Sequence, residues 1–197
     1  KQITFPSLPG LTLGAGGRKA LIHTTEGWRR GALPPFSWYA TAGYAPNYTC
    51  SLVERTWWQH IADDKGSYTL QDLKGGIATN RAGERLIQIE VHANAATVDK
   101  DFTADEWEWF GRTLRELCDA NDIPWTFADL WVSYPASYGL NTRQRMSGVE
   151  FTQFSGVCGH QHAPENDHGD PGALPVGLIY QAGLPPAPVP PTPPEED

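Results

Sequence analysis

The sequence predicts an α/β fold with a central mixed β-sheet flanked by helices. Apolar runs at 19–25 and 85–92 have the length and composition of buried strands. Two stretches rich in Tyr, Thr, Val and Trp, separated by a short polar turn, predict a β-hairpin at 47–61. Residues 103–120 have the periodicity of an amphipathic helix. A chain of 197 residues can bury a full core, so we expect one domain with a short appendage.

Composition and charge argue against several classes of partner. The net charge is −8 and Lys and Arg do not cluster, which disfavours nucleic acid and anionic membranes. No apolar run approaches the ~20 residues needed to cross a bilayer. Cys50, Cys118 and Cys158 are odd in number and lack CxxC spacing, so we expect buried thiols rather than disulfides. The chain begins at Lys1 without Met, and we expect it to be part of a longer protein.

The first predicted strand carries a histidine near its carboxyl end. Residues 19–25 read Lys-Ala-Leu-Ile-His-Thr-Thr, which places His23 two residues before the end of the run. In open α/β sheets the ligand crevice lies beyond the carboxyl ends of the strands, so this histidine is well placed for chemistry. A hydrogen-bonded core histidine fits the same position. His60, on the second strand of the hairpin, is expected to be structural.

The strand at 85–92 carries a carboxylate in its middle. Its alternation gives one face of Ile and Val and a second face of Leu86, Gln88, Glu90 and His92. A carboxylate at mid-strand is costly to bury unless it is paired or functional. Glu90 is therefore a candidate functional residue, and a solvated surface face is the alternative.

The remaining elements are the helix, an aromatic loop and a short terminal helix. Thr103 and Glu106 form a capping box that starts the helix at 103–120. Residues 27–46 are broken by Pro and Gly and contain several Trp and Tyr, so we expect a loop that lines a groove or folds inward as a cover. A last helix is expected at 173–182. The eight tryptophans of the chain suit a core and also the stacking of sugars.

Metal-capable side chains gather in one stretch, the His-rich loop (159–172). It reads GHQHAPENDHGDPG and holds three of the six histidines. Its two Pro and three Gly predict that most of it is loop. A catalytic zinc takes three protein ligands and leaves one position for water. The residues alone leave two ligand sets open: His160, His162 and His168 from the loop, or His23, His160 and Asp170 from strand and loop together.

Three motifs follow one another along the chain. They are His23-Thr-Thr-Glu-Gly at a strand end, Ile87-Gln-Ile-Glu-Val91, and Gly159-His-Gln-His-Ala-Pro ahead of Asp170-Pro-Gly. In this order they resemble the type 2 N-acetylmuramoyl-L-alanine amidases, which share a fold with peptidoglycan recognition proteins. The resemblance spans about residues 19 to 182. It is closest to the amidase domains of actinobacteriophage endolysins of the lysin A type.

The resemblance implies roles for four residues. His23 matches the first zinc ligand, His160 the second, and Asp170 the third, where some relatives carry Cys. Glu90 matches the strand carboxylate that acts as general base in the bacterial members. These roles favour the ligand set of His23, His160 and Asp170 over the set of three loop histidines.

The sequence also departs from the family pattern. His168 stands where many relatives carry a Lys that stabilises the oxyanion, so His168 would have to donate a hydrogen bond there. His162 matches no ligand and would be structural. The tyrosine that assists catalysis in some relatives has no clear counterpart near Pro46 and Asn47.

The resemblance further implies a substrate, partners and a place of action. It implies a Zn²⁺-dependent hydrolase, spanning 1–183, that cuts the amide between N-acetylmuramic acid and L-alanine in bacterial peptidoglycan and lyses a host cell wall. The seven prolines of 184–194 predict a linker or tail at 184–197, leading to a cell-wall-binding domain. Such an enzyme would be a monomer, made in the host cytoplasm and active on the host wall. A secreted bacterial enzyme is the alternative origin.

Two other functions stay open on the sequence. The first is a module of the same fold that binds peptidoglycan without cutting it. The second is a different zinc hydrolase that uses the three histidines of the His-rich loop and leaves His23 dispensable.

Overall fold

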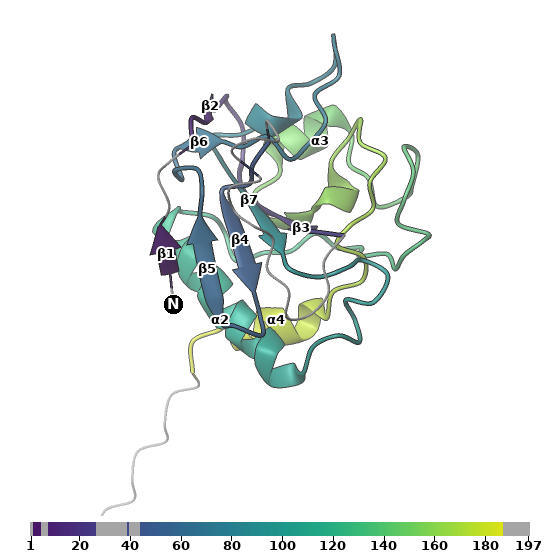
Figure 1. Cartoon of the computed structure of the whole chain (residues 1–197). Helices are drawn as coiled ribbons and strands as arrows, with labels where there is room; N and C mark the ends of the chain where they lie inside the picture. The colour runs from purple at the N-terminus through teal and green to yellow at the C-terminus, as the bar shows by residue number, and fades with distance from the viewer. Residues whose placement is uncertain (1, 5–7, 27–38, 40–43, 187–197) are drawn as a thin grey trace, which may run out of the picture.

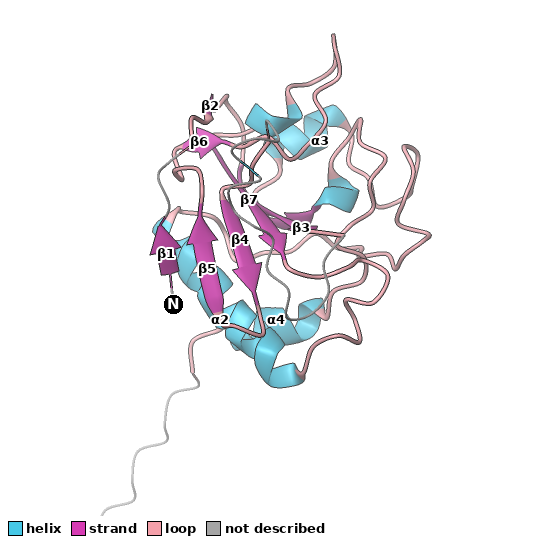
Figure 2. Cartoon of the chain, viewed as in Figure 1, coloured by secondary structure: helices cyan, strands magenta, loops and turns pink. Residues whose placement is uncertain are grey.

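The central sheet of the computed structural model is mixed and lies between two layers of helix (Figures 1 and 2). The structure describes residues 2–4, 8–26, 39 and 44–186. Within them six strands run in the order β1-β5-β4-β7-β3-β8: Gln2–Thr4, Thr56–Gln59, Tyr48–Ser51, Arg85–Val91, Arg18–Thr24 and Gly156–Gly159. Neighbours are parallel except in the hairpin β4/β5. The predicted fold class, the hairpin and both buried strands are confirmed. A separate antiparallel pair joins β2 (Leu11–Thr12) to β6 (Lys65–Gly66).

One face of the sheet is covered by helices α2 (Ala104–Ala120) and α4 (Val176–Ala182). The capping box that starts α2 forms as predicted: Thr103 accepts from the Glu106 backbone, and the Glu106 carboxylate accepts in return. The apolar stripe of α2 packs against the Ile and Val side chains of β7, and α4 packs beside α2. Each fully buried side chain of this size contributes about 1.5–3 kcal/mol. This layer therefore supplies most of the core.

The opposite face of the sheet is also covered. Helix α3 (Gly148–Gln153) and the 3-10 turns η1 (Thr79–Arg81) and η2 (His160–His162) pack there, around Leu21, Leu86 and Phe151. Glu90 is consequently buried, and the solvated alternative for its face is wrong. Because both faces are covered, any polar side chain on β3 or β7 needs a partner inside the protein.

Other expectations have mixed outcomes. The three cysteines are free and buried, as expected. The helix expected at 173–182 is α4. Most of the aromatic loop expected at 27–46 and most of the Pro-rich segment expected at 184–197 lie outside the described residues. Among the described helices, none has the length and apolar character needed to cross a membrane.

Candidate metal centre

Strand pairing places His23 and Glu90 side by side. Strands β3 and β7 are parallel and in register, so His23 lies directly opposite Glu90. On the other side of β7, Thr49 of β4 lies opposite the same glutamate. Residues paired across neighbouring strands point to the same face, so the three side chains form one row. That row lies near the carboxyl ends of β3 and β7, and His23 was predicted at such a strand end.

The His-rich loop folds back so that its two ends meet this row. His160 begins η2 directly after β8, the second neighbour of β3. The Gln161 backbone N–H donates to the Asp170 carbonyl at 2.8 Å, and the Gln161 side chain donates to Gly172 O at 2.7 Å. The Asp170 carboxylate in turn accepts from the Thr24 backbone N–H at 3.2 Å. Backbone contacts therefore set the position of Asp170.

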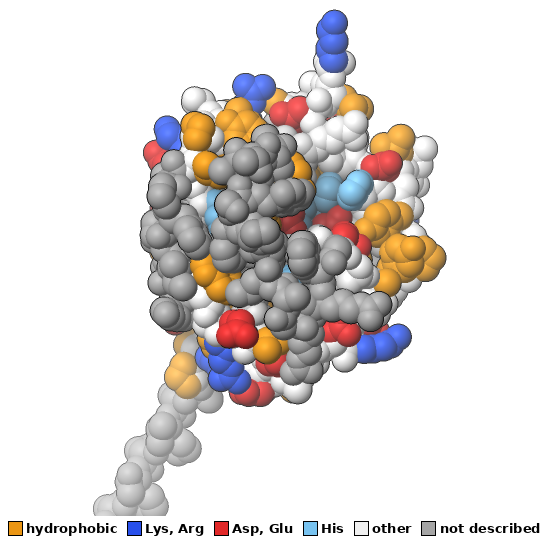
Figure 3. All heavy atoms as spheres, viewed as in Figure 1, with side chains coloured by type: hydrophobic (Ala, Val, Ile, Leu, Met, Phe, Trp, Pro, Cys, Tyr) orange, Lys and Arg blue, Asp and Glu red, His pale blue; other side chains and the backbone are white. Residues whose placement is uncertain are grey.

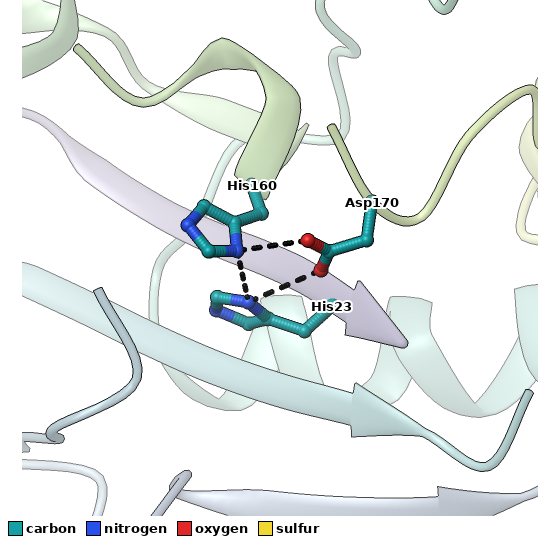
Figure 4. Close-up of side chains that lie close together, drawn as sticks. All are labelled: His23, His160 and Asp170. Carbon is teal, nitrogen blue, oxygen red and sulfur yellow. Dashed lines mark hydrogen bonds and ion pairs between the residues drawn. The ribbon is translucent and has the colours of Figure 1, made fainter. Parts of the chain in front are cut away.

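His23, His160 and Asp170, here called the ligand triad, converge on one point (Figure 4). The two Nδ1 atoms lie 3.1 Å apart. His160 Nδ1 is 3.0 Å from Asp170 Oδ1, and His23 Nδ1 is 3.5 Å from Asp170 Oδ2. Donors that each bind one tetrahedral zinc at about 2.0–2.1 Å lie about 3.3 Å from one another. The spacing of the triad therefore fits a zinc ion.

The outer nitrogens of both histidines are held by side-chain amides. His23 Nε2 lies 3.0 Å from Gln88 Oε1, and His160 Nε2 lies 3.0 Å from Asn166 Oδ1. The Asn166 orientation is set by the Gln71 backbone N–H, which donates to the same oxygen at 2.8 Å. An amide oxygen only accepts, so each Nε2 carries the proton and each Nδ1 offers a lone pair. This is the arrangement in which metal-binding histidines are usually oriented.

The electrostatics of the triad favour a cation. Burial lowers the pKa of His23. Burial also lowers the pKa of His160, but the charge and hydrogen bond of Asp170 outweigh it and the net shift is upward. Burial would raise the pKa of Asp170, yet the two histidines hold it well below its usual range. Asp170 Oδ1 lies 3.0 Å from His160 Nδ1, but with the proton of His160 on Nε2 it receives no hydrogen bond from a described residue. An ionised, buried oxygen without a donor is costly, and a bound cation would remove that cost.

Glu90 lies beside the triad in a cavity of about 440 Å³. Burial, together with the charges of Asp170 and Glu26, raises its pKa well above the usual range. Its Oε2 atom is buried and has no hydrogen bond within the described part of the chain. A carboxylate with a raised pKa holds a proton more readily than an ordinary glutamate, which suits a group that accepts and passes on a proton.

The other two loop histidines are not members of the triad, although His168 lies directly beside it. The His168 side chain is 61% exposed, stacks on His160 with ring centroids 5.2 Å apart, and lies 3.8 Å from Asp170. His162 is buried, accepts from the Gly159 N–H at 2.8 Å and bonds the Leu130 carbonyl at 2.9 Å. Both nitrogens of His162 are thus used by the backbone. The alternative ligand set of His160, His162 and His168 does not converge on one point. Among the described residues, the triad is the one group whose ligand atoms lie close enough to share an ion.

Several residues of the site were missed from the sequence. Tyr44 lines the same cavity as Glu90, and burial followed by the Glu90 charge raises the pKa of Tyr44. The sequence showed no clear counterpart of the relatives' tyrosine near Pro46, and Tyr44 lies two residues before that position. Gln88 lies on the same face of β7 as Glu90. The alternation of the strand sequence placed both residues on that face, and it was the one signal that could have marked Gln88. Nothing local marks Asn166.

Comparison with solved structures shows the fold. The chain resembles the hydrolase AmiA from Staphylococcus aureus, solved with its ligand, with a TM-score of 0.57 and 12% identity over 93% of this chain and 80% of that chain. It also resembles the N-acetylmuramoyl-L-alanine amidase LysC from Clostridium intestinale, with a TM-score of 0.52 and 10% identity over 92% and 95%. No protein-family model and no curated protein sequence matches the chain. The fold expected from the three motifs is therefore present.

Proposed function

We propose that this protein is a zinc-dependent N-acetylmuramoyl-L-alanine amidase that hydrolyses bacterial peptidoglycan. The observation that carries the proposal is the convergence of the ligand triad beside Glu90, at the carboxyl ends of two strands. The shared fold with an amidase supports the same reading of the site. The substrate bond would be the amide between the lactyl group of N-acetylmuramic acid and L-alanine.

The triad would hold the zinc, with Gln88 and Asn166 fixing its two imidazoles. A zinc ion held there supplies Lewis-acid activation of a water molecule and of the substrate carbonyl. Two imidazoles and one carboxylate are a ligand set that leaves a fourth position open. The donor set therefore fits a catalytic ion rather than a closed structural one.

Glu90 and His168 would move and place protons around that centre. Glu90 takes the proton from the attacking water and passes it to the leaving amine of L-alanine. His168 donates a hydrogen bond to the carbonyl oxygen as negative charge develops on it. The exposed position of His168 at the cavity keeps it within reach of an entering substrate.

A peptidoglycan-binding module without activity is the second candidate. A complete ligand triad and an adjacent carboxylate favour the enzyme, because a binder has no need of them. The wider reading, in which residues 1–183 act as the amidase domain of a phage endolysin made in the host cytoplasm, extends the proposal. In that reading, the Pro-rich segment links the domain, a monomer, to a cell-wall-binding domain.

Two measurements on the purified protein test the proposal. Mass spectrometry of digested peptidoglycan should show free stem peptides that begin with L-alanine. Metal analysis should show one zinc per chain. Muramyl peptides that keep the lactyl–alanine bond would contradict the amidase, and a protein without stoichiometric metal that still binds peptidoglycan would favour the binding module.

A further inference from the structure

Two tyrosines with no part in the reaction described above contact the rim of the cavity through His168: Tyr138 lies against His168, and Tyr134 lies against Tyr138. We infer that Tyr134 and Tyr138, here called the saccharide wall, bind the N-acetylmuramyl ring that carries the scissile amide. This inference rests on the proposed amidase function and names the part of the site that holds the sugar. Three observations support it: the ring contacts of the two tyrosines, the carboxylate of Glu26, and the acidic lining of the cavity.

The wall continues a row of rings that starts at the ligand triad. His160 stacks on His168, and the His168 ring lies 6.0 Å from the Tyr138 ring. Tyr138 in turn meets Tyr134 edge to face, with centroids 5.4 Å apart and planes at 82°. Tyr134 is 49% exposed, one of the few large apolar side chains so exposed among the described residues. An aromatic surface therefore runs from the metal site outward to solvent.

Glu26 lies in the electrostatic neighbourhood of Tyr138: burial, followed by the charges of Asp170 and Glu26, raises the pKa of the Tyr138 hydroxyl. The Glu26 carboxylate accepts from the Ala95 backbone N–H at 3.0 Å and from the Thr24 hydroxyl. The Glu26 carbonyl accepts from the Asn94 side chain at 2.5 Å. A carboxylate offers about four acceptor directions, and among the described residues two hydrogen-bond donors are seen on Glu26. Because Glu26 lines the cavity, its carboxylate can accept from a ligand hydroxyl there.

The chemistry of the wall suits a sugar better than a stem peptide. A pyranose ring has an apolar C–H face and an edge of hydroxyls, which match an exposed tyrosine ring and a carboxylate acceptor. The stem peptide carries carboxylates, and the cavity is lined by Glu26, Glu90, Asp167 and Asp170. Among its described lining residues there is no Lys or Arg. Figure 3 shows acidic, histidine and hydrophobic side chains gathered together on this face.

A pair of substrates separates sugar binding from chemistry. The first is N-acetylglucosaminyl-N-acetylmuramyl-L-alanyl-D-isoglutamine, and the second is D-lactoyl-L-alanyl-D-isoglutamine, which keeps the scissile amide but has no sugar ring. Tyr134→Ala should raise KM for the first by a factor of about 2 to 12, the worth of one aromatic stacking contact. Its kcat/KM for the second substrate should stay within about twofold of the wild type, because no contact to that molecule is removed.

Two further variants serve as controls. Tyr134→Phe keeps the ring and should retain the wild-type KM. Leu140→Ala removes another exposed apolar side chain, 56% exposed and in the same loop, and should behave as wild type on both substrates. An equal loss on both substrates in Tyr134→Ala, or no loss on either, would overturn the saccharide wall.

A binding measurement keeps this inference separate from the proposed activity. The free disaccharide N-acetylglucosaminyl-N-acetylmuramic acid is added to the zinc-loaded protein, and saturation transfer to its ring protons is recorded by NMR. Transfer should occur with the wild type, and the Kd obtained by titrating the disaccharide should rise by about 2- to 12-fold in Tyr134→Ala. If the wild type cuts neither substrate but shows this dependence, the amidase proposal fails and the wall stands. If the wild type does not bind the disaccharide, the wall is wrong.

Discussion

Glu90 is the residue whose environment differs most from that of an ordinary strand glutamate. It is buried, lacks a hydrogen bond on Oε2 among the described residues, and has a pKa raised by burial and by two neighbouring carboxylates. Glu90→Gln keeps the shape but cannot take a proton, so kcat should fall by about 10²–10⁴. Zinc content should stay at one per chain. Activity assays and metal analysis on the same preparation check both.

His23→Ala is the matched comparison for that variant. It removes a member of the ligand triad, so it should lose zinc and activity together. Glu90→Gln protein with wild-type turnover would show that another group moves the proton, with Tyr44 the next candidate in the cavity.

A substitution of Asn166 tests whether the residues that hydrogen-bond to the triad histidines contribute to zinc affinity. Its amide oxygen accepts from His160 Nε2, so Asn166→Leu should weaken zinc binding by about 10- to 100-fold through loss of imidazole orientation. Competition against a chelating dye measures the affinity. Asn141→Leu, at an exposed position of the preceding loop, should leave it unchanged. Equal affinities in the two variants would mean that the triad needs no support from Asn166.

At the residue scale, the sequence predicted the chemistry that motifs carry and missed the supporting contacts. His23 and Glu90 were predicted because each stands on a strand whose pattern is local. Asn166 was not, because its partners Gln71 and His160 come from segments far apart along the chain. The roles assigned to the triad, to Glu90 and to His168 stay predictions until the variants above are measured.

At the scale of elements, strand β3 has a second buried ionisable group at the end opposite His23. Lys19 is fully buried; its Nζ donates to the Ala82 carbonyl at 2.5 Å and lies 5.1 Å from the centre of the Phe151 ring. Burial lowers the pKa of Lys19 from 10.5 to about 8. Because the pKa of Lys19 is lower in the folded protein than in the unfolded chain, the unfolded chain binds more protons at pH values between about 8 and 10.5. The stability contribution of Lys19 should therefore rise with pH from about 8 to 10.5 and stay at its lowest below pH 8.

Lys19→Met isolates this effect. The difference in unfolding free energy between Lys19→Met and wild type should shift in favour of the wild type as the pH rises from 7 to 10. Urea unfolding at several pH values measures it, and other titrating groups cancel in the difference. A difference that is constant with pH would show that Lys19 is not desolvated in the folded protein.

The elements predicted correctly are those with local signals. Helix α2 has its capping box and apolar stripe within the short stretch 103–120. The order of the strands has no such signal, because β7 pairs with β3 and β4 across long stretches of chain. The turn η2 was also unpredicted, since its conformation depends on backbone contacts with Asp170 rather than on helix propensity.

At the scale of the whole molecule, the ligand triad joins the first part of the chain to the last. His23 lies in β3, and His160 and Asp170 lie 137 and 147 residues further on. An ion that binds only the folded state stabilises it by about 4 kcal/mol when its concentration is 1,000 times Kd. Chelation should therefore lower Tm, and added zinc should restore it. His23→Ala protein should show no such dependence in a thermal scan, and a Tm that chelation leaves unchanged in the wild type would contradict the metal site.

The strand order has a consequence for how the protein is made. Strand β3 has two neighbours, β7 and β8, and both follow it in the chain. While the polypeptide emerges from the ribosome, β3 has no partner until residues 85–91 are available, and its second edge stays open until 156–159 follow. Open apolar strand edges are sites of aggregation. Nascent chains stopped between these two points should therefore be the forms that most need protection by chaperones.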